Sequence, residues 1–158
     1  MDAEKFTKKS LEVIESCEKL AYEYNNQELT QAHLMYALVT VEDSLVAKLL
    51  TNMGINMEAF KGECEKLVAN RPKVSGGQLF TSPEFSKALI QAEKEAKQMG
   101  DDYISVEHIF LGLLEKADKD IKRVINAYGI TRGKFLEVLA NIRGNRKVES
   151  DNPEDTYD

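Results

Sequence analysis

The feature that most constrains this chain is an internal repeat. The segment Thr30–Leu38 reads TQAHLMYAL, and the segment Ser105–Leu113, 75 positions later, reads SVEHIFLGL. Each segment has a hydroxyl residue, a histidine three positions later and an apolar run that contains a small residue. The chain's two histidines, His33 and His108, both lie in these segments. Such self-similarity at a fixed offset indicates one structural unit that is used twice.

The same offset holds without a gap over most of the chain. It predicts a repeat domain over residues 1–147, with repeat one over 6–69, a linker over 70–81 and repeat two over 82–145. The remainder, 148–158, is an acidic tail. Among the identical pairs at this offset are Glu18 and Glu93, Leu38 and Leu113, Gly54 and Gly129, Ile55 and Ile130, and Phe60 and Phe135.

Composition favours a globular domain whose two repeats share one core. The chain has 158 residues, of which 42% are hydrophobic and 30% charged, as in typical globular proteins. No apolar run is long enough to span a bilayer and no signal-peptide pattern is present, so we expect a cytoplasmic protein without a membrane partner. The net charge is −6, but five of the acids lie in the tail. The nearly neutral remainder argues against a nucleic-acid partner.

The two cysteines are expected to be buried apolar side chains. Cys17 and Cys64 fall at apolar helical positions, where repeat two has Ala92 and Leu139. Buried free cysteines behave as small hydrophobic residues, and disulfides are rare in the cytosol. A metal site would need more Cys or His ligands than the chain places together.

Helical periodicity predicts an all-α fold of eight helices. Apolar residues recur at helical spacing in both repeats, and no segment alternates with a period of two. Glycines followed by isoleucine, at Gly54 and Gly129, predict helix ends with a left-handed residue. The expected arrangement is two pseudo-symmetric four-helix repeats packed as one domain. The expected N-cap residues are Thr7, Thr30, Asp43 and Asn56 in repeat one and Ser82, Ser105, Asp118 and Thr131 in repeat two.

The two histidines have a structural interpretation in this frame. With Thr30 and Ser105 as N-caps, His33 and His108 occupy the third helical position. A side chain there can reach back to the N-cap backbone N–H, as Glu or Gln does in a capping box. A catalytic histidine would need a nucleophile or a carboxylate partner at a motif spacing, and the sequence offers none.

The repeat resembles a known family. The runs AHLMYAL and EHIFLGLL, the paired Gly-Ile stops and the spacing of the repeats are similar to the double N-terminal repeat of the Clp/Hsp100 ATPases over residues 4–147. The tail narrows the resemblance, because Arg143–Arg146 (RGNR) and Asn152–Tyr157 (NPEDTY) look like the ClpB-type members. In those members such a segment leads into the first ATPase module.

This resemblance implies a non-catalytic substrate-binding domain. The sequence has no G-x-x-x-x-G-K-[ST] phosphate loop, so we expect no ATP binding, no cofactor and no enzymatic activity from it. The implied parent is a hexameric, ATP-driven disaggregase that works with the Hsp70 system. The isolated domain is expected to be a monomer, and the acidic tail 148–158 is expected to be a tether toward the ATPase module.

The resemblance also implies a ligand and a site. The ligand is an exposed apolar segment of an unfolded or aggregated polypeptide, held in a groove between helices. The residues it places there are Thr7, Leu89, Asp101, Tyr103 and Glu107. A purely structural role is equally open for three of them, with Thr7 as a cap, Asp101 as a loop acid and Glu107 as a favourable charge at a helix start. Three polar residues, Gln91, Glu95 and His108, fall where an apolar groove needs hydrophobic side chains.

A second functional class remains open. ClpA- and ClpC-type domains imply docking of an adaptor or recognition of phosphoarginine. In ClpC-like domains both repeats tend to have glutamate directly before the histidine, whereas this chain has Ala32 and Glu107. An alanine cannot grip a guanidinium, so we expect phosphoarginine to bind weakly or not at all.

Overall fold

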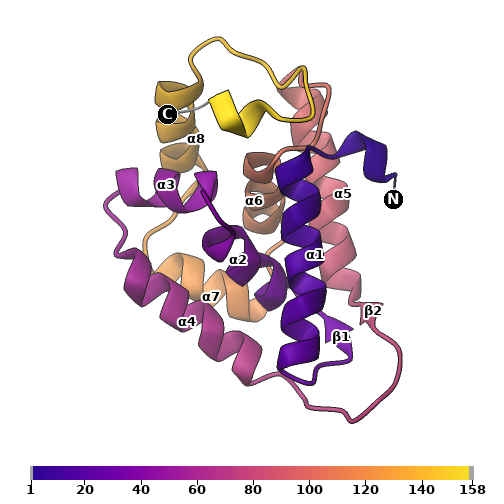
Figure 1. Cartoon of the computed structure of the whole chain (residues 1–158). Coiled ribbons are helices and arrows are strands. Elements are labelled where there is room, and N and C mark those ends of the chain that lie inside the picture. The colour runs from indigo at the N-terminus through magenta and orange to yellow at the C-terminus, as the bar shows by residue number, and fades with distance from the viewer. Residues whose placement is uncertain (1, 157–158) are drawn as a thin grey trace.

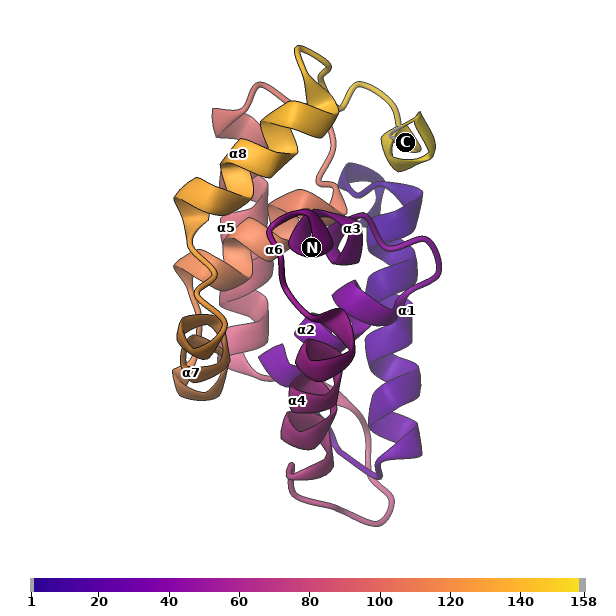
Figure 2. The same cartoon turned by 90° about the vertical axis from the view of Figure 1, so that its left-hand side faces the viewer.

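The computed structural model describes residues 2–156, and within them the prediction of an all-α fold with eight α-helices is confirmed (Figure 1). Figures 1 and 2 show the two longest helices, α1 and α5, standing upright with shorter helices around them. The α-helices are α1 (Lys8–Glu23), α2 (Gln31–Thr40), α3 (Leu45–Asn52), α4 (Met57–Ala69), α5 (Pro83–Gln98), α6 (Val106–Glu115), α7 (Lys119–Ala127) and α8 (Arg132–Arg143). Two short 3₁₀ helices, η1 (Ala3–Lys5) and η2 (Pro153–Thr156), and two strands, β1 (Glu28–Leu29) and β2 (Phe80–Thr81), complete the elements.

The helices begin at the predicted caps, with one exception. The exception is α3, whose N-cap is Ser44 and not the predicted Asp43: the Ser44 hydroxyl accepts from the Ala47 N–H at 2.9 Å. Asp43 has φ +54°, whereas an N-cap residue needs an extended backbone. Aspartate tolerates the left-handed conformation, so the loop before α3 is one residue longer than its counterpart before α7.

The predicted glycine stops are confirmed in detail. Gly54 has φ +85° and Gly129 has φ +65°. The following isoleucine N–H reaches back to the carbonyl five residues earlier, from Ile55 to Leu50 at 3.1 Å and from Ile130 to Ile125 at 3.0 Å. This pattern is a Schellman motif, which needs the left-handed residue that glycine supplies.

Two short strand pairings, absent from the sequence prediction, connect the repeats. Strands β1 and β2 pair in parallel, with Leu29 opposite Thr81, and an isolated parallel bridge joins Phe6 to Ile104. These two pairings are related by the 75-residue offset. In each case the segment before the first helix of one repeat lies beside the segment before the second helix of the other. Strands of two residues have no measurable alternation, so periodicity could not predict them.

The two repeats share a single core. Buried apolar residues from α1 to α8 form one continuous cluster. The rings of Phe60 in repeat one and Tyr128 in repeat two meet edge to face with centroids 5.1 Å apart. Cys17 and Cys64 are buried and unbonded, as the sequence predicted. Burial raises the pKa of the Cys17 thiol well above its ordinary value and that of Cys64 to about 12, so both remain neutral.

The described part of the acidic tail lies on the body of the protein. Val148 is buried, and its carbonyl accepts from the Asp102 N–H at 2.8 Å. The Lys8 N–H donates to the Asp151 carbonyl at 2.7 Å. Figures 1 and 2 both show η2, in yellow, near the start of α1. The tail expected to be a tether therefore lies against the rest of the domain from 148 to 154. A connection to a further module stays a prediction, and residues 157–158 lie outside the described part.

Candidate functional site

Three of the five predicted site residues meet at the start of α6. Thr7 caps α1, Asp101 follows the end of α5, and Glu107 is the second residue of α6. They come together because the bridge between Phe6 and Ile104 places the start of α1 beside the segment that enters α6. All three are buried. We call the set of Thr7, Asp101, Ser105 and Glu107 the repeat-two junction.

His108 organises this junction as the sequence predicted. Its Nδ1 accepts from the Ser105 N–H at 2.9 Å, which completes a capping box. An acceptor Nδ1 leaves the proton on Nε2, which donates to Asp101 Oδ2 at 2.7 Å. The imidazole is fully buried, so it orients the loop and the helix start rather than facing a ligand.

The counterpart in repeat one has the same geometry with a neutral partner. His33 Nδ1 accepts from the Thr30 N–H at 3.0 Å, and Nε2 donates to Asn26 Oδ1 at 2.8 Å. The Asn26 amide is oriented by its own donation to the Pro72 carbonyl at 3.1 Å. Burial, and secondarily the charge of Arg71, lowers the pKa of His33 to about 4. His33 is therefore neutral at physiological pH.

Repeat two has Asp101 at the position where repeat one has Asn26. The negative charge of Asp101 is accompanied by a positive charge, that of Arg143. Arg143 Nη2 contacts Asp101 Oδ2 at 2.5 Å, and its Nε lies 3.9 Å from Glu107 Oε2. Burial alone works to raise the pKa of Asp101, but hydrogen bonds from His108, Arg143 and the Val148 N–H hold that pKa below its ordinary value. The Ser105 hydroxyl donates to Glu107. Sequence reasoning missed Arg143; the available signal was a cation at the position where repeat one has the apolar Val68.

A second residue that sequence reasoning missed comes from the tail. Glu154 is 8% exposed, and its Oε2 accepts from the Thr7 hydroxyl at 2.8 Å and from the Val106 N–H at 3.4 Å. Burial, and the nearby charge of Glu107, raise the pKa of Glu154 above its ordinary value. The repeat-two junction is thus covered by the chain's own tail.

The other two predicted site residues lie apart from this polar cluster. Leu89 is buried in the core, and Tyr103 is half-buried. Of the three polar residues that the sequence placed along the groove, His108 belongs to the repeat-two junction, whereas Gln91 and Glu95 lie on α5 and bond to each other. Glu95 is buried and pairs with Arg132 at 2.6 and 3.0 Å and with Gln91 at 2.9 Å, so it forms a separate charged cluster on α5.

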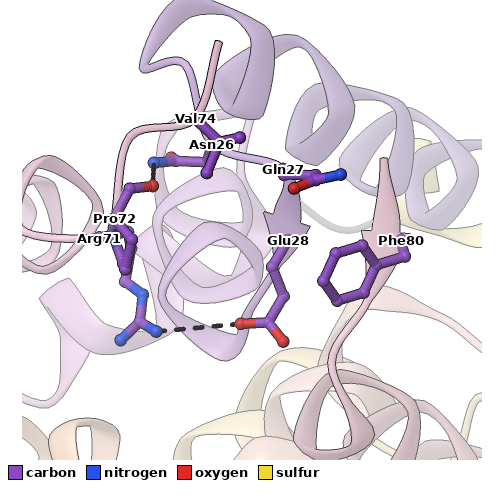
Figure 3. A pocket seen from close by; sticks show the side chains of 7 residues that line it. All are labelled: Asn26, Gln27, Glu28, Arg71, Pro72, Val74 and Phe80. Carbon is purple, nitrogen blue, oxygen red and sulfur yellow. Dashed lines mark hydrogen bonds and ion pairs between the residues drawn. The ribbon is translucent and has the colours of Figure 1, made fainter. Parts of the chain in front are cut away.

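Repeat one has an open hollow that sequence reasoning did not find. Its volume is about 180 Å³, and Figure 3 shows the side chains that line it. Phe80 and Val74 are 51% and 43% exposed, and the Arg71 guanidinium lies 3.9 Å from Glu28. The complete lining is Asn26, Gln27, Glu28, Arg71, Pro72, Val74 and Phe80.

A wider hollow of about 430 Å³ continues from it, again with Glu28 and Arg71 in its wall. Thr30 and Ser82 line this second hollow, and at the 75-residue offset they match Ser105 and Thr7. We call Thr30, Arg71, Ser82 and the hollow in Figure 3 the repeat-one junction. It is open where the repeat-two junction is covered.

The described residues contain neither a group of metal-ligand side chains nor a helix that could span a membrane. Within residues 2–156, no three His, Cys, Asp or Glu side chains are grouped so that they could hold a metal ion. In the same range, no helix is both long and apolar enough to cross a membrane. What the two junctions offer is hydrogen-bonding groups at helix starts and, in repeat one, exposed apolar side chains.

Comparison with known proteins agrees with this fold. The family model of the Clp repeat (R) N-terminal domain matches residues 5–128, so the chain belongs to the Clp repeat N-terminal domain family. Within it, the whole chain matches the N-terminal region of ClpB chaperones. It is 41% identical to ClpB of Nitratidesulfovibrio vulgaris and 38% identical to ClpB of Clostridium tetani, in both cases over 100% of this chain. The chain spans 19% of the length of those relatives.

Solved structures share the fold at low sequence identity. The Hsp104 N-terminal domain from Candida albicans superposes with a TM-score of 0.83 at 20% identity, over 95% of this chain and 99% of that one. A complex of the ClpV N-domain with a VipB peptide superposes with a TM-score of 0.69 at 18% identity, over 86% and 85%. The eight-helix architecture is therefore that of Clp-type N-domains.

Proposed function

We propose that this domain is the substrate-binding module of a ClpB-type disaggregase, and that it engages exposed apolar segments of unfolded or aggregated polypeptides. The observation that carries the proposal is the hollow of the repeat-one junction, whose wall exposes Phe80 and Val74 beside the Arg71–Glu28 ion pair (Figure 3). An apolar wall beside a few polar groups is the usual composition of a peptide-binding site. The ClpV N-domain, which shares the fold, forms a complex with a peptide.

The repeat-two junction is the second part of the proposed surface. Thr7, Asp101 and Glu107 stand at the place where the family resemblance puts substrate contacts, and Leu89 and Tyr103 would supply the apolar side. Because Asp101 and Glu107 are already bonded to Arg143 and Ser105, their proposed role is to hold the helix start in shape. Thr7, which is buried beneath Glu154, is the group that a ligand would contact once Glu154 is displaced.

The proposed cellular setting comes from the ClpB relatives. There the domain would be one part of a hexameric, ATP-driven protein in the bacterial cytoplasm, where it delivers stress-denatured proteins together with the Hsp70 system. The domain itself would catalyse no reaction and carry no cofactor. Delivery to a separate motor requires weak, reversible contacts, so we expect dissociation constants in the micromolar range or weaker.

The test is a chemical-shift titration of the 158-residue chain with a permanently unfolded protein, reduced carboxymethylated α-lactalbumin. We expect the changes to concentrate on the two junctions, with the largest on Val74, Phe80 and their neighbours in the repeat-one junction. Phe80→Ser should weaken binding about tenfold, because it removes the largest apolar group of the wall. Ile90→Ser, on an apolar residue of α5 that is 49% exposed and does not line the hollow, is the matched control. Shifts spread evenly over the surface, with equal effects of both variants, would contradict the proposal.

The alternative function is recognition of an adaptor or of phosphoarginine, as in ClpA- and ClpC-type domains. Repeat one has Ala32 where a carboxylate would be needed, and in repeat two the Glu107 carboxylate is occupied by Ser105 and faces Arg143. Neither repeat therefore presents a free carboxylate at the position directly before its histidine. We expect calorimetry with free phosphoarginine to show weak binding or none. Two tight, equivalent sites per domain would instead favour the ClpC-type function.

A further inference from the structure

The chain carries a segment that closes one of the two junctions. Residues 148–154 cross the repeat-two junction and make backbone contacts on both sides of it, from Asp102 to the Val148 carbonyl at 2.8 Å and from Lys8 to the Asp151 carbonyl at 2.7 Å. Beyond these contacts, the carboxylate of Glu154, a residue of η2, enters the junction and binds Thr7 and Val106. We call residues 148–154 the strap.

The pseudo-symmetry allows the place of the strap in repeat two to be compared with the equivalent place in repeat one. Thr7 and Val106, the two donors to Glu154, correspond at the 75-residue offset to Ser82 and Gln31. In repeat one Ser82 borders the open hollow of about 430 Å³, and no tail segment lies there in the described part of the chain. The strap therefore lies in repeat two at the place where repeat one has a hollow lined by Thr30 and Ser82.

The Glu154 contact is suited to repeated release. Only one carboxylate oxygen is bonded: Oε1 is buried without a hydrogen-bond partner among residues 2–156. The carboxylate also lies close enough to Glu107 to feel its negative charge. A buried anion with an unsatisfied oxygen and a like charge nearby is held less strongly than its burial suggests. Release of the strap returns that oxygen to water.

We propose that the strap is an intramolecular lid on the repeat-two junction, latched by Glu154, and that a bound polypeptide displaces it. This inference rests on the proposed function, because it names how one part of the proposed binding surface is gated. A ligand that needs the open form binds with an affinity reduced by the fraction of time the strap is open. Weakening the latch therefore increases affinity without adding any contact to the ligand.

The experiment measures binding of reduced carboxymethylated α-lactalbumin to the whole chain and to three variants. Glu154→Ala removes the latch, and Glu154→Gln keeps its shape but removes its charge. Asp151→Asn removes one charge from an exposed side chain of the same strap and leaves the backbone contact to Lys8 in place. Melting curves confirm that each variant folds. Hydrogen exchange of the Lys8 and Asp102 amides, which donate to the strap, reports its opening directly.

We expect Glu154→Ala to bind about three to ten times more tightly than the unmodified chain, Glu154→Gln to bind with intermediate affinity, and Asp151→Asn to bind equally well. The Lys8 and Asp102 amides should lose protection when the unfolded protein is bound. Equal affinities for all four proteins, or full protection of these two amides in the bound state, would contradict the proposal that the strap is a lid. The proposed function would not be affected. Absence of binding by every variant would contradict the proposed function and the lid together.

Discussion

At the scale of single residues, the two buried histidines show how one substitution changes the charge balance of a site. His33 and His108 both accept from an N-cap backbone N–H and both donate from Nε2. The acceptor is neutral in repeat one, Asn26, and charged in repeat two, Asp101. Because a buried carboxylate needs compensation, the charged version comes with Arg143, whereas repeat one has an apolar residue at that position.

Arg143→Val should therefore be strongly destabilising. The change leaves Asp101 without its ion pair at 2.5 Å and removes the cation facing Glu107. Breaking a buried pair from one side typically costs about 3–5 kcal/mol of unfolding free energy. Denaturant unfolding measures the loss.

The matched control copies the neutral composition of repeat one into repeat two. The triple variant Asp101→Asn, Glu107→Ala and Arg143→Val carries the residues found 75 positions earlier. It removes both carboxylates together with the cation, so most of the lost stability should return. A triple variant no more stable than Arg143→Val would show that Arg143 acts through packing and not through charge.

His33 should make the stability of the domain sensitive to acid. Its pKa falls from 6.5 to about 4 on folding, so between these values the unfolded chain binds the proton and the folded chain does not. The unfolding free energy should therefore decrease as pH falls from about 6.5 to 4, by about 3 kcal/mol from this residue. Unfolding curves recorded across that range for the unmodified chain and for His33→Gln isolate the effect.

The unmodified chain must be compared with His33→Gln because other groups also titrate in acid and change the stability. The lowered pKa values of Glu95 and Asp101 also reduce stability in acid, and the raised pKa of Glu154 acts in the opposite direction. Glutamine can keep the capping-box contact but cannot take up the proton. If His33→Gln loses stability in acid as steeply as the unmodified chain, the histidine does not carry the effect.

The sequence could assign the capping role of the histidines because the N-cap residue is only three positions away. It did not predict the acceptors of the two Nε2 protons, Asn26 and Asp101, which are seven positions away. The contacts of Arg143 with Asp101 and of Glu154 with Thr7 join residues 42 and 147 positions apart. Nothing in local periodicity encodes such contacts, so the charged half of the site could be found only in the folded structure.

At the scale of elements, the contact between α5 and α6 depends on one glycine, Gly112. A Cβ at Gly112 of α6 would meet the Ala88 carbonyl oxygen of α5 at 2.3 Å and the Ala92 nitrogen at 3.0 Å. Both atoms belong to backbone, so no side chain can move aside. At the equivalent position of α2 repeat one has Ala37, so glycine is a requirement of the α5–α6 contact and not of the repeat.

Gly112→Ala should therefore destabilise the domain by about 3 kcal/mol, the cost of forcing extra volume into a packed interface. The control is Gly62→Ala in α4, where a Cβ would meet nothing within 4 Å. Alanine is the better helix former, so the control should gain about 0.5–1 kcal/mol. Thermal unfolding distinguishes the two, and a stabilising Gly112→Ala would show that α5 and α6 can separate at little cost.

The ends of the helices could be predicted wherever a specific residue, such as an N-cap or a glycine, determines them. The helix ends at Gly54 and Gly129 and most helix starts follow from capping chemistry that the sequence displays. The start of α3 was misplaced because Asp43 and Ser44 are both good N-cap residues and only the backbone angle of Asp43 decides between them. The strap was missed for a different reason: its acids are typical of a free tail, and its attachment depends on distant groups.

At the scale of the whole molecule, Gln31 joins the two repeats. Its side chain is fully buried at the start of α2, and Nε2 donates to the Glu84 carbonyl at 3.0 Å and to the Lys116 carbonyl at 2.8 Å. Its Oε1 accepts from the Asp118 N–H at 2.8 Å. One amide from repeat one thus satisfies three backbone groups of repeat two. Together with the continuous apolar core, this contact favours unfolding of the domain as a single unit.

Gln31→Ala tests this cooperativity. Three partly buried backbone groups of repeat two lose their partner, so we expect the unfolding free energy to fall by about 2–4 kcal/mol. If the repeats unfold together, the core amides of α2 and α6, such as those of Leu38 and Leu113, should lose hydrogen-exchange protection by the same factor. Gln98→Ala, at an exposed position at the end of α5, should leave both unchanged. Loss of protection confined to repeat two would show instead that each repeat is a separate folding unit. Gln31 would then contribute only to the contact between the repeats.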